Sequence, residues 1–261
     1  MIKELVSKIK RKYKRKQSNR ELDSTTELPH LKNHICVLFC YQNFEHIKQC
    51  FNSIYDDKTD YFIVENYSSN SNDIKEYFLG KRLIGYIQFE QNITNNAANI
   101  FLRDFKHKLI EYKYTTFSDC DLLVHSKELL FGELFDNLEH KNVLVSCADL
   151  EMENLPNVKG SENWIPKSIT TDIHIEGFTG IHFLTIKNEN LDFFEKIHFL
   201  DTNLHLKCKK LKKKWVKTLK NKVYHLTWDI YFDGNDYFEF KVKNFNNLWN
   251  HKVVCDYKII V

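Results

Sequence analysis

YTTFSDCDLLV, residues 114–124, decides how the rest of the chain is interpreted. Tyr114 to Phe117 predicts a buried strand, and two aspartates, Asp119 and Asp121, follow it directly. No other aspartates in the chain are two positions apart. Carboxylates at a strand end suit Mg²⁺ or Mn²⁺, which prefer oxygen ligands and keep places for phosphate oxygens and water. The segment therefore indicates a site for a metal with a diphosphate, and two solvated aspartates in a turn are the alternative.

The chain before this segment alternates between strand and helix patterns. We expect strands at 35–39, 61–64 and 84–89, and helices at 45–55, 73–79 and 93–111. This alternation predicts an α/β fold with a mostly parallel sheet covered on both faces. Ligands of such sheets bind beyond the carboxyl ends of the strands. Polar residues follow Phe39, Val64 and Phe117 at those positions.

The second half of the chain is less regular. Strand patterns occur at 143–147, 183–186 and 222–226, helical patterns at 190–198 and 202–213, and a long loop is expected at 151–171. The absence of an obvious linker favours a single core over two small ones.

The composition is that of a soluble globular protein, with 43% hydrophobic and 28% charged residues. No apolar run approaches the ~20 residues that span a membrane, and the N-terminus lacks the apolar segment of a secretory signal. None of the seven cysteines forms a C-x-x-C pair. We therefore expect a reduced, cytoplasmic protein without disulfides or structural zinc.

Positive charge is concentrated in two segments, although the net charge is only +3. Residues 2–13 predict a basic amphipathic helix that either rests on an anionic membrane surface or is a solvated helix or tail. Residues 207–222 are rich in lysine. A solvated helix face is the favoured interpretation of this Lys cluster, and contact with a phosphorylated acceptor or a membrane is the alternative.

Five short motifs, in order along residues 35–125, resemble the nucleotide-binding half of a GT-A glycosyltransferase, especially family 2. They are C-Y-Q-N at 40–43 (T-Y-N-R in the family), C-F-x-S-I at 50–54 (C-L-x-S-I), V-E-N-x-S at 64–68 (V-D-N-x-S), Q-N-x-T-x-x-A-A-N at 91–99 (N-x-G-x-x-x-A-x-N) and D-C-D at 119–121 (D-x-D).

The resemblance implies a GT-A-like three-layer fold. A nucleotide-binding half at 34–125 and an acceptor-binding half at 126–261 would follow a basic helix and linker at 1–33. The implied donor-binding residues are Tyr41, Asn43, Glu65, Asn66, Asn92, Asn99 and Asp119. The chain departs from the family where Asn43 replaces Arg, Glu65 replaces Asp and Thr94 replaces Gly.

Two later motifs extend the resemblance. L-D-T-N-L at 200–204 resembles E-D-x-D-L, which implies that Asp201 is the general base, and V-Y-H-L at 223–226 resembles v-y-H-l. His225 would then complete a metal shell with Asp119 and Asp121. Leu200 and Asn203 stand where the family has acids. The alternatives are a helix N-cap for Asp201 and a hydrogen-bonded polar residue at a strand end for His225.

Other carboxylates compete with Asp201 for the role of base. They are Asp172, Glu176 and Asp229. Trp228 beside Asp229 suits a sugar, because an indole face covers C–H groups while a carboxylate accepts hydrogen bonds from hydroxyls. We predict Asp172, Trp228 and Asp229 as acceptor-binding residues.

The motifs and the family resemblance together predict a metal-dependent glycosyltransferase. It would transfer a sugar from a nucleotide-sugar donor, with a UDP-sugar as first choice, to a hydroxyl of a growing cell-surface glycan or lipid-linked saccharide. The resemblance implies inversion by single displacement, with Mn²⁺ or Mg²⁺ as cofactor. A cytoplasmic location, at the inner face of the cell membrane if the basic helix binds there, is expected.

Two other classes remain as alternatives. A nucleotidyltransferase of similar fold usually needs a glycine-rich phosphate loop, and this chain has only seven glycines. A non-catalytic nucleic-acid or membrane-binding protein would use the basic segments. The acidic body of the chain would repel phosphates, so no nucleic-acid partner is expected.

Overall fold

The computed structural model describes residues 32–94, 96–156, 158–159, 167–177, 180–195, 201–236, 238–239 and 255–261. The predicted basic helix at 2–13 lies outside these residues. No helix in the described part of the chain has both the length and the apolar character needed to cross a membrane.

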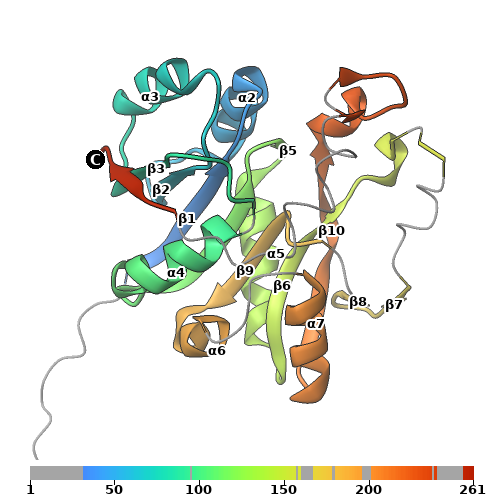
Figure 1. Cartoon of the computed structure of the whole chain (residues 1–261). Coiled ribbons are helices and arrows are strands. Elements are labelled where there is room, and N and C mark those ends of the chain that lie inside the picture. The colour runs from blue at the N-terminus through green and yellow to red at the C-terminus, as the bar shows by residue number, and fades with distance from the viewer. Residues whose placement is uncertain are drawn as a thin grey trace, which may run out of the picture. The chain divides into compact units, whose positions relative to one another are not determined.

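The first half alternates strands and helices as expected (Figure 1). Its elements are β1 (Lys32–Cys40), α2 (Phe44–Ile54), β2 (Asp60–Glu65), α3 (Ser71–Leu79), β3 (Gly85–Phe89), α4 (Asn96–Leu109), β4 (Tyr112–Asp119) and β5 (Leu122–Val124). Each predicted strand and helix between residues 35 and 117 is confirmed within a few residues.

The second half contains longer strands and shorter helices. Its elements are α5 (Lys127–Glu139), β6 (Val143–Leu150), the short helix η1 (Met152–Asn154), β7 (Ser168–Thr170), β8 (Ile175–Gly177), β9 (Phe183–Lys187), η3 (Asn188–Asn190), α6 (Leu191–Glu195), α7 (Asp201–Lys210), β10 (Lys214–His225), η4 (Leu226–Ile230) and β11 (Tyr257–Ile259).

Within the described residues the strands form one sheet in the order β11-β3-β2-β1-β4-β9-β6-β10-β8-β7, and β5 pairs with β10 outside this path. The pairs β1–β2, β2–β3 and β6–β10 are parallel. β9 lies between β4 and β6 and is antiparallel to both. β3–β11, β5–β10, β8–β10 and β7–β8 are also antiparallel. The prediction of a mostly parallel sheet is therefore wrong, because the second half adds antiparallel strands that strand–helix alternation cannot reveal.

Helices cover both faces of the sheet, and β1 shows why. Successive side chains of a strand point to opposite faces. Ile35 and Val37 join a core with α4, α6 and α7, whereas Cys36 and Leu38 join a core with α2, α3 and α5. All four are fully buried. An apolar run without polar alternation therefore marks a strand buried on both sides.

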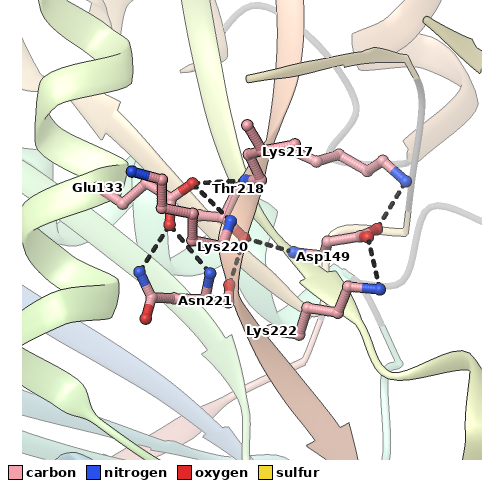
Figure 2. Close-up of polar contacts among 8 residues, drawn as sticks. Glu133, Asp149, Lys217, Thr218, Lys220, Asn221 and Lys222 are labelled. Atoms are coloured by element: carbon pink, nitrogen blue, oxygen red, sulfur yellow. Dashed lines mark hydrogen bonds and ion pairs between the residues drawn. The ribbon is translucent and has the colours of Figure 1, made fainter. Parts of the chain in front are cut away.

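A wide bulge interrupts β10 where it pairs with β6 (Figure 2). Lys217 pairs with Cys147 and Lys222 with Asp149, so five steps on β10 correspond to two on β6. The Glu133 carboxylate of α5 accepts hydrogen bonds from the backbone N–H groups of residues 219, 220 and 221 and from the Asn221 side chain. The carboxylate thus provides hydrogen-bond acceptors for backbone N–H groups that do not pair with β6 in the bulge.

The bulge also gathers charge around Asp149. Residues five apart on a regular strand face opposite sides, but the three extra residues bring Lys217 and Lys222 to the same carboxylate. Lys217 Nζ lies 2.6 Å from Asp149 Oδ1, and Lys222 Nζ lies 3.7 Å from Oδ2. Lys217 is only 6% exposed. The interpretation of residues 207–222 as one solvated helix face is therefore wrong, because helix α7 ends at Lys210 and β10 begins at Lys214.

Candidate active site

The Asp119-Cys120-Asp121 turn joins β4 to β5 at the edge where β1 also ends. Cys120 is 7% exposed and its thiol contacts Cys40 at the end of β1. The Cys50 thiol of α2 donates to the Asp119 carbonyl at 3.6 Å. Burial raises the pKa of the Cys40 and Cys50 thiols, so they are neutral apolar groups behind the turn. With Cys120 turned into this apolar wall, the flanking aspartates stay partly exposed.

Asp119 is bound to His182, which precedes β9. The Asp119 backbone N–H donates to the His182 carbonyl at 2.8 Å, and His182 Nδ1 lies 3.0 Å from Asp119 Oδ2. A carboxylate only accepts hydrogen bonds, so Nδ1 is the donor. The side chains of His182 and Asp119 are 30% and 44% exposed, which leaves the pair accessible to a ligand.

Asp121 is bound to residues that follow β10. Its carbonyl accepts the Leu226 N–H at 2.8 Å, and the Thr227 hydroxyl donates to Oδ2 at 2.5 Å. His225 Nδ1 lies 3.9 Å from the same oxygen. The pairing of His225 with Leu122 between β10 and β5 sets this arrangement.

Two imidazoles and an indole line this part of the site. The rings of His182 and His225 are 5.0 Å apart at 84°, and the Trp228 ring stacks on His225 at 4.8 Å and 7°. The structure thus brings the predicted residues Asp119, Asp121, His225 and Trp228 together. It adds His182 and Thr227, which no sequence motif indicated.

The loops after β1 and β2 are joined to one another. The Gln42 N–H donates to Ser68 Oγ at 2.9 Å, and Ser69 Oγ donates to the Gln42 side chain at 2.7 Å. Gln42 and Asn43 both have left-handed backbone angles, with φ of 52° and 39°. Such conformations in non-glycine residues are held by their surroundings and are concentrated at functional sites.

Asn66 links the end of β2 to the segment before α4. Its Oδ1 accepts the Ile93 N–H at 2.8 Å, and its Nδ2 donates to the Thr94 carbonyl at 3.1 Å. Asn92 Oδ1 accepts the Thr94 N–H at 2.9 Å. Thr94, where the family has glycine, has φ of 53°. The family's glycine would relieve this left-handed conformation, which costs an L-residue about 1–2 kcal/mol.

The remaining predicted donor residues differ in accessibility. Tyr41, Asn43 and Asn99 are half-buried. Glu65 is fully buried, and its carboxylate accepts hydrogen bonds from the Ser71 and Tyr86 hydroxyls. Binding of a base by Glu65 stays a prediction, and it would require this carboxylate to exchange one of these partners.

His46, in the first turn of α2, contacts the loop after β1. Asn43 Nδ2 lies 2.9 Å from His46 Nδ1. Burial lowers the pKa of His46, and the carboxylates of Asp121 and Asp229 partly oppose this shift. Asp229 is exposed and accepts the Tyr224 hydroxyl at 2.7 Å. The carboxylates of Asp121 and Asp229 therefore both act on the His46 imidazole.

Two predicted residues are placed less directly. Asp201 begins α7, but its side chain lies outside the described part of the structure, so its role as base stays a prediction. Asp172 is exposed in the turn of the β7–β8 hairpin. This hairpin pairs with β10 at Val216 and Lys217, well before His225.

The contact between His182 and Asp119 can be predicted only if the pairing of β4 with β9 is known. Phe183 pairs with Ser118, so the residue before β9 faces Asp119. The sequence indicates the strand at 183–186 but not its partner. Thr227 was hidden for the same reason, because its contact with Asp121 depends on the β5–β10 pairing.

The residues present fit a metal that arrives with a diphosphate. In the described residues, no three His, Cys, Asp or Glu side chains converge into a ready-made metal site. Mg²⁺ usually needs only one or two protein carboxylates when phosphate oxygens and water supply the other ligands. Asp119 and Asp121 meet that requirement, whereas a resident metal in an all-protein site would need more.

The chain is similar to three curated relatives from Acanthamoeba polyphaga mimivirus. Uncharacterized protein L137 is 34% identical over 234 residues (82% of this chain and 32% of the relative). Uncharacterized protein L142 is 31% identical over 244 residues (86% and 50%), and uncharacterized protein L138 is 30% identical over 244 residues (86% and 28%). The chain thus spans half or less of the length of these relatives. No protein-family model matches it.

Comparison with solved structures finds a likeness in fold. The mannosyltransferase PcManGT from Pyrobaculum calidifontis, in complex with GDP-Man and Mn²⁺, matches with a TM-score of 0.56 and 11% identity, over 87% of this chain and 66% of that one. A197 from STIV matches with a TM-score of 0.43 and 14% identity, over 74% and 85%, which is too low to establish a shared fold. The chain therefore shares the fold of this mannosyltransferase, which supports the GT-A-like fold that the sequence motifs implied.

Proposed function

We propose that the chain is a glycosyltransferase that binds a nucleotide-sugar donor beside Asp119 and Asp121 and transfers the sugar to an acceptor hydroxyl. One observation carries the proposal. The loops after β1, β2 and β4 converge at one sheet edge, where each of the two aspartates accepts a hydrogen bond from a distant segment. In open α/β sheets this edge is where ligands bind.

The donor side of the site is the joined pair of loops after β1 and β2. Tyr41, Asn43, Asn66, Asn92 and Asn99 supply amide and hydroxyl groups for a nucleoside. The GT-A resemblance favours a UDP-sugar, and the GDP-Man in the mannosyltransferase of similar fold supports testing guanosine donors as well.

A divalent ion would be held by Asp119 and Asp121, with the His225 imidazole 3.9 Å from the Asp121 carboxylate. When bound, the ion supplies neutralisation of the charge that develops on the leaving diphosphate. The chain contributes fixed carboxylates on a turn that Cys120 anchors in the core.

A general base must face the anomeric carbon from the side opposite the diphosphate if transfer inverts the configuration. Asp201 is our first candidate. Asp201→Asn should abolish transfer and leave donor binding largely intact, because the amide cannot take up a proton. Full activity of this variant would move the role to Asp229 or Asp172.

We also propose where the acceptor binds. A growing cell-surface glycan or a lipid-linked saccharide would bind near Trp228 and Asp229. Trp228 stacks on His225, whose Nδ1 lies 3.9 Å from Asp121 Oδ2. Trp228→Ala should therefore weaken acceptor use more than donor binding.

A thermal-shift screen of nucleotide sugars tests donor binding. UDP- and GDP-sugars are added with Mn²⁺, and each measurement is repeated with EDTA. A bound donor raises the melting temperature by mass action, with about 2.7 kcal/mol at 100 times the Kd. We expect at least one donor to stabilise the protein in a manner that EDTA removes. No shift with any donor would contradict the proposal.

A further inference from the structure

We propose that His182 is a positioning residue of the metal site: it fixes the Asp119 carboxylate in the orientation that a divalent ion bound with a nucleoside diphosphate requires. The inference rests on the proposed function. It concerns a residue that the GT-A motifs did not indicate, because His182 lies outside every matched segment.

The sheet itself brings His182 to Asp119. β4 and β9 pair from Tyr114 with Lys187 to Ser118 with Phe183, and the next bond joins the Asp119 N–H to the His182 carbonyl at 2.8 Å. The side chains add a second bond, at 3.0 Å between Nδ1 and Oδ2. Backbone and side-chain bonds between the same two residues leave the carboxylate little freedom to rotate.

The position of the His182 imidazole depends on the absence of a side chain at Gly180. A Cβ added to Gly180 would stand 2.4 Å from His182 Nε2 and 2.7 Å from Cδ2. Nonbonded carbon and nitrogen atoms do not approach this closely, so the ring can lie here only if residue 180 is glycine. The ring is thus held between the Asp119 carboxylate at one edge and the Gly180 backbone at the other.

A similar arrangement exists at the second aspartate. The Thr227 hydroxyl donates to Asp121 Oδ2, as His182 Nδ1 donates to Asp119 Oδ2. Each carboxylate therefore accepts a hydrogen bond from a segment far away in the sequence. Donors that orient metal-binding carboxylates typically change metal affinity 10–100-fold when they are removed.

The histidine–carboxylate pair of His125 and Glu151 provides a matched control. Its atoms are 2.9 Å apart, but the His125 side chain is 59% exposed and the pair lies outside the aspartate turn. Removing the His125 imidazole also breaks a histidine–carboxylate contact, but at a place that the proposal does not involve.

The experiment measures Mn²⁺ affinity by electron paramagnetic resonance in the presence of UDP or GDP. His182→Leu removes the donor, whereas His182→Asn keeps an N–H at nearly the position of Nδ1 in a side chain of similar size. We expect His182→Leu to bind Mn²⁺ about 10–100-fold more weakly, with His182→Asn within a few-fold of the wild type. His125→Leu should equal the wild type.

Gly180→Ala gives an independent test that retains the histidine but moves its ring. The added methyl must displace the ring, so the loss of Mn²⁺ affinity should resemble that of His182→Leu. Gly132→Ala, where nothing lies within 4 Å of the added methyl, is the control. A melting temperature for every variant separates loss of affinity from loss of folding.

The outcomes separate the two proposals. If the wild type binds no Mn²⁺ with either diphosphate, the proposed function fails and this inference fails with it. If the wild type binds Mn²⁺ and folded His182→Leu binds it equally well, only the role of His182 is overturned. Weak binding by both His182→Leu and His182→Asn, with normal melting temperatures, would also contradict a role for the Nδ1 donor.

Discussion

His34 shows what burial does to a single titratable residue. It is 4% exposed, its Nε2 lies 2.8 Å from Thr116 Oγ1, and its ring makes edge contacts with the rings of Phe131 and Phe135. Burial lowers its pKa to about 3, although the charge of Asp56 acts in the opposite direction. The folded protein therefore keeps this imidazole neutral over most of the acidic range.

The stability of the protein should consequently fall in acid. The folded pKa lies below the unfolded value of 6.5, so between these values the unfolded chain binds more protons than the folded one. The free energy of unfolding then decreases by up to about 1.4 kcal/mol per pH unit as the pH falls from 6.5 towards 3. Urea unfolding at pH 7 and pH 4.5 measures this loss.

His34→Gln removes the titration and keeps a polar side chain near Thr116. The wild type should lose on the order of 2 kcal/mol more than this variant between the two pH values. Equal losses in the two proteins would show that His34 does not govern the acid response.

At the scale of elements, the bulge in β10 depends on one carboxylate. Glu133 accepts hydrogen bonds from three backbone N–H groups and one amide (Figure 2). Glu133→Gln removes the charge and half of the acceptor oxygens, so the free energy of unfolding should fall by about 1.5–3 kcal/mol. Urea unfolding measures it, and Asp136→Asn on the exposed face of the same helix should change it by less than about 0.5 kcal/mol. Equal effects of the two variants would refute the role of Glu133.

The start of β3 depends on a close contact with β2. A Cβ at Gly85 would stand 2.2 Å from the Phe62 ring, which is itself buried. Gly85→Ala should therefore destabilise the protein by about 1–3 kcal/mol. Gly132→Ala, in the open middle of α5, should instead stabilise by about 0.5–1 kcal/mol. Thermal unfolding of both proteins distinguishes these opposite signs, and a neutral Gly85→Ala would show that Phe62 can move.

The elements that the sequence predicts well are those with local signals. Apolar runs such as Ile35–Phe39 and helical spacing such as Ile47 to Ile54 lead to β1 and α2. β10 was missed in part because its lysines suggest a solvated helix, while the bulge that buries Lys217 depends on Glu133, far away in the sequence. The direction of β9 was also unpredictable, since antiparallel pairing with β4 is a long-range choice.

At the scale of the whole molecule, the site is assembled by strands that are distant in sequence. The motifs predicted the turn Asp119–Asp121 and the later His225, and the structure brings these residues together. They did not predict His182 or Thr227, because these contacts follow from the positions of β9 and β10 in the sheet. Sequence motifs thus indicated the proposed ligands, and only the assembled sheet revealed the residues that donate hydrogen bonds to the two aspartates.

Release of nucleoside diphosphate tests the central claim most directly. Wild type and Asp121→Asn are incubated with UDP- and GDP-sugars, with Mn²⁺ or with EDTA, and free diphosphate is quantified. We predict Mn²⁺-dependent release from at least one donor and a loss of at least about 100-fold in Asp121→Asn that retains its fold. Absence of release and of binding with every donor, or undiminished release by Asp121→Asn, would contradict a nucleotide-sugar transferase built on this turn.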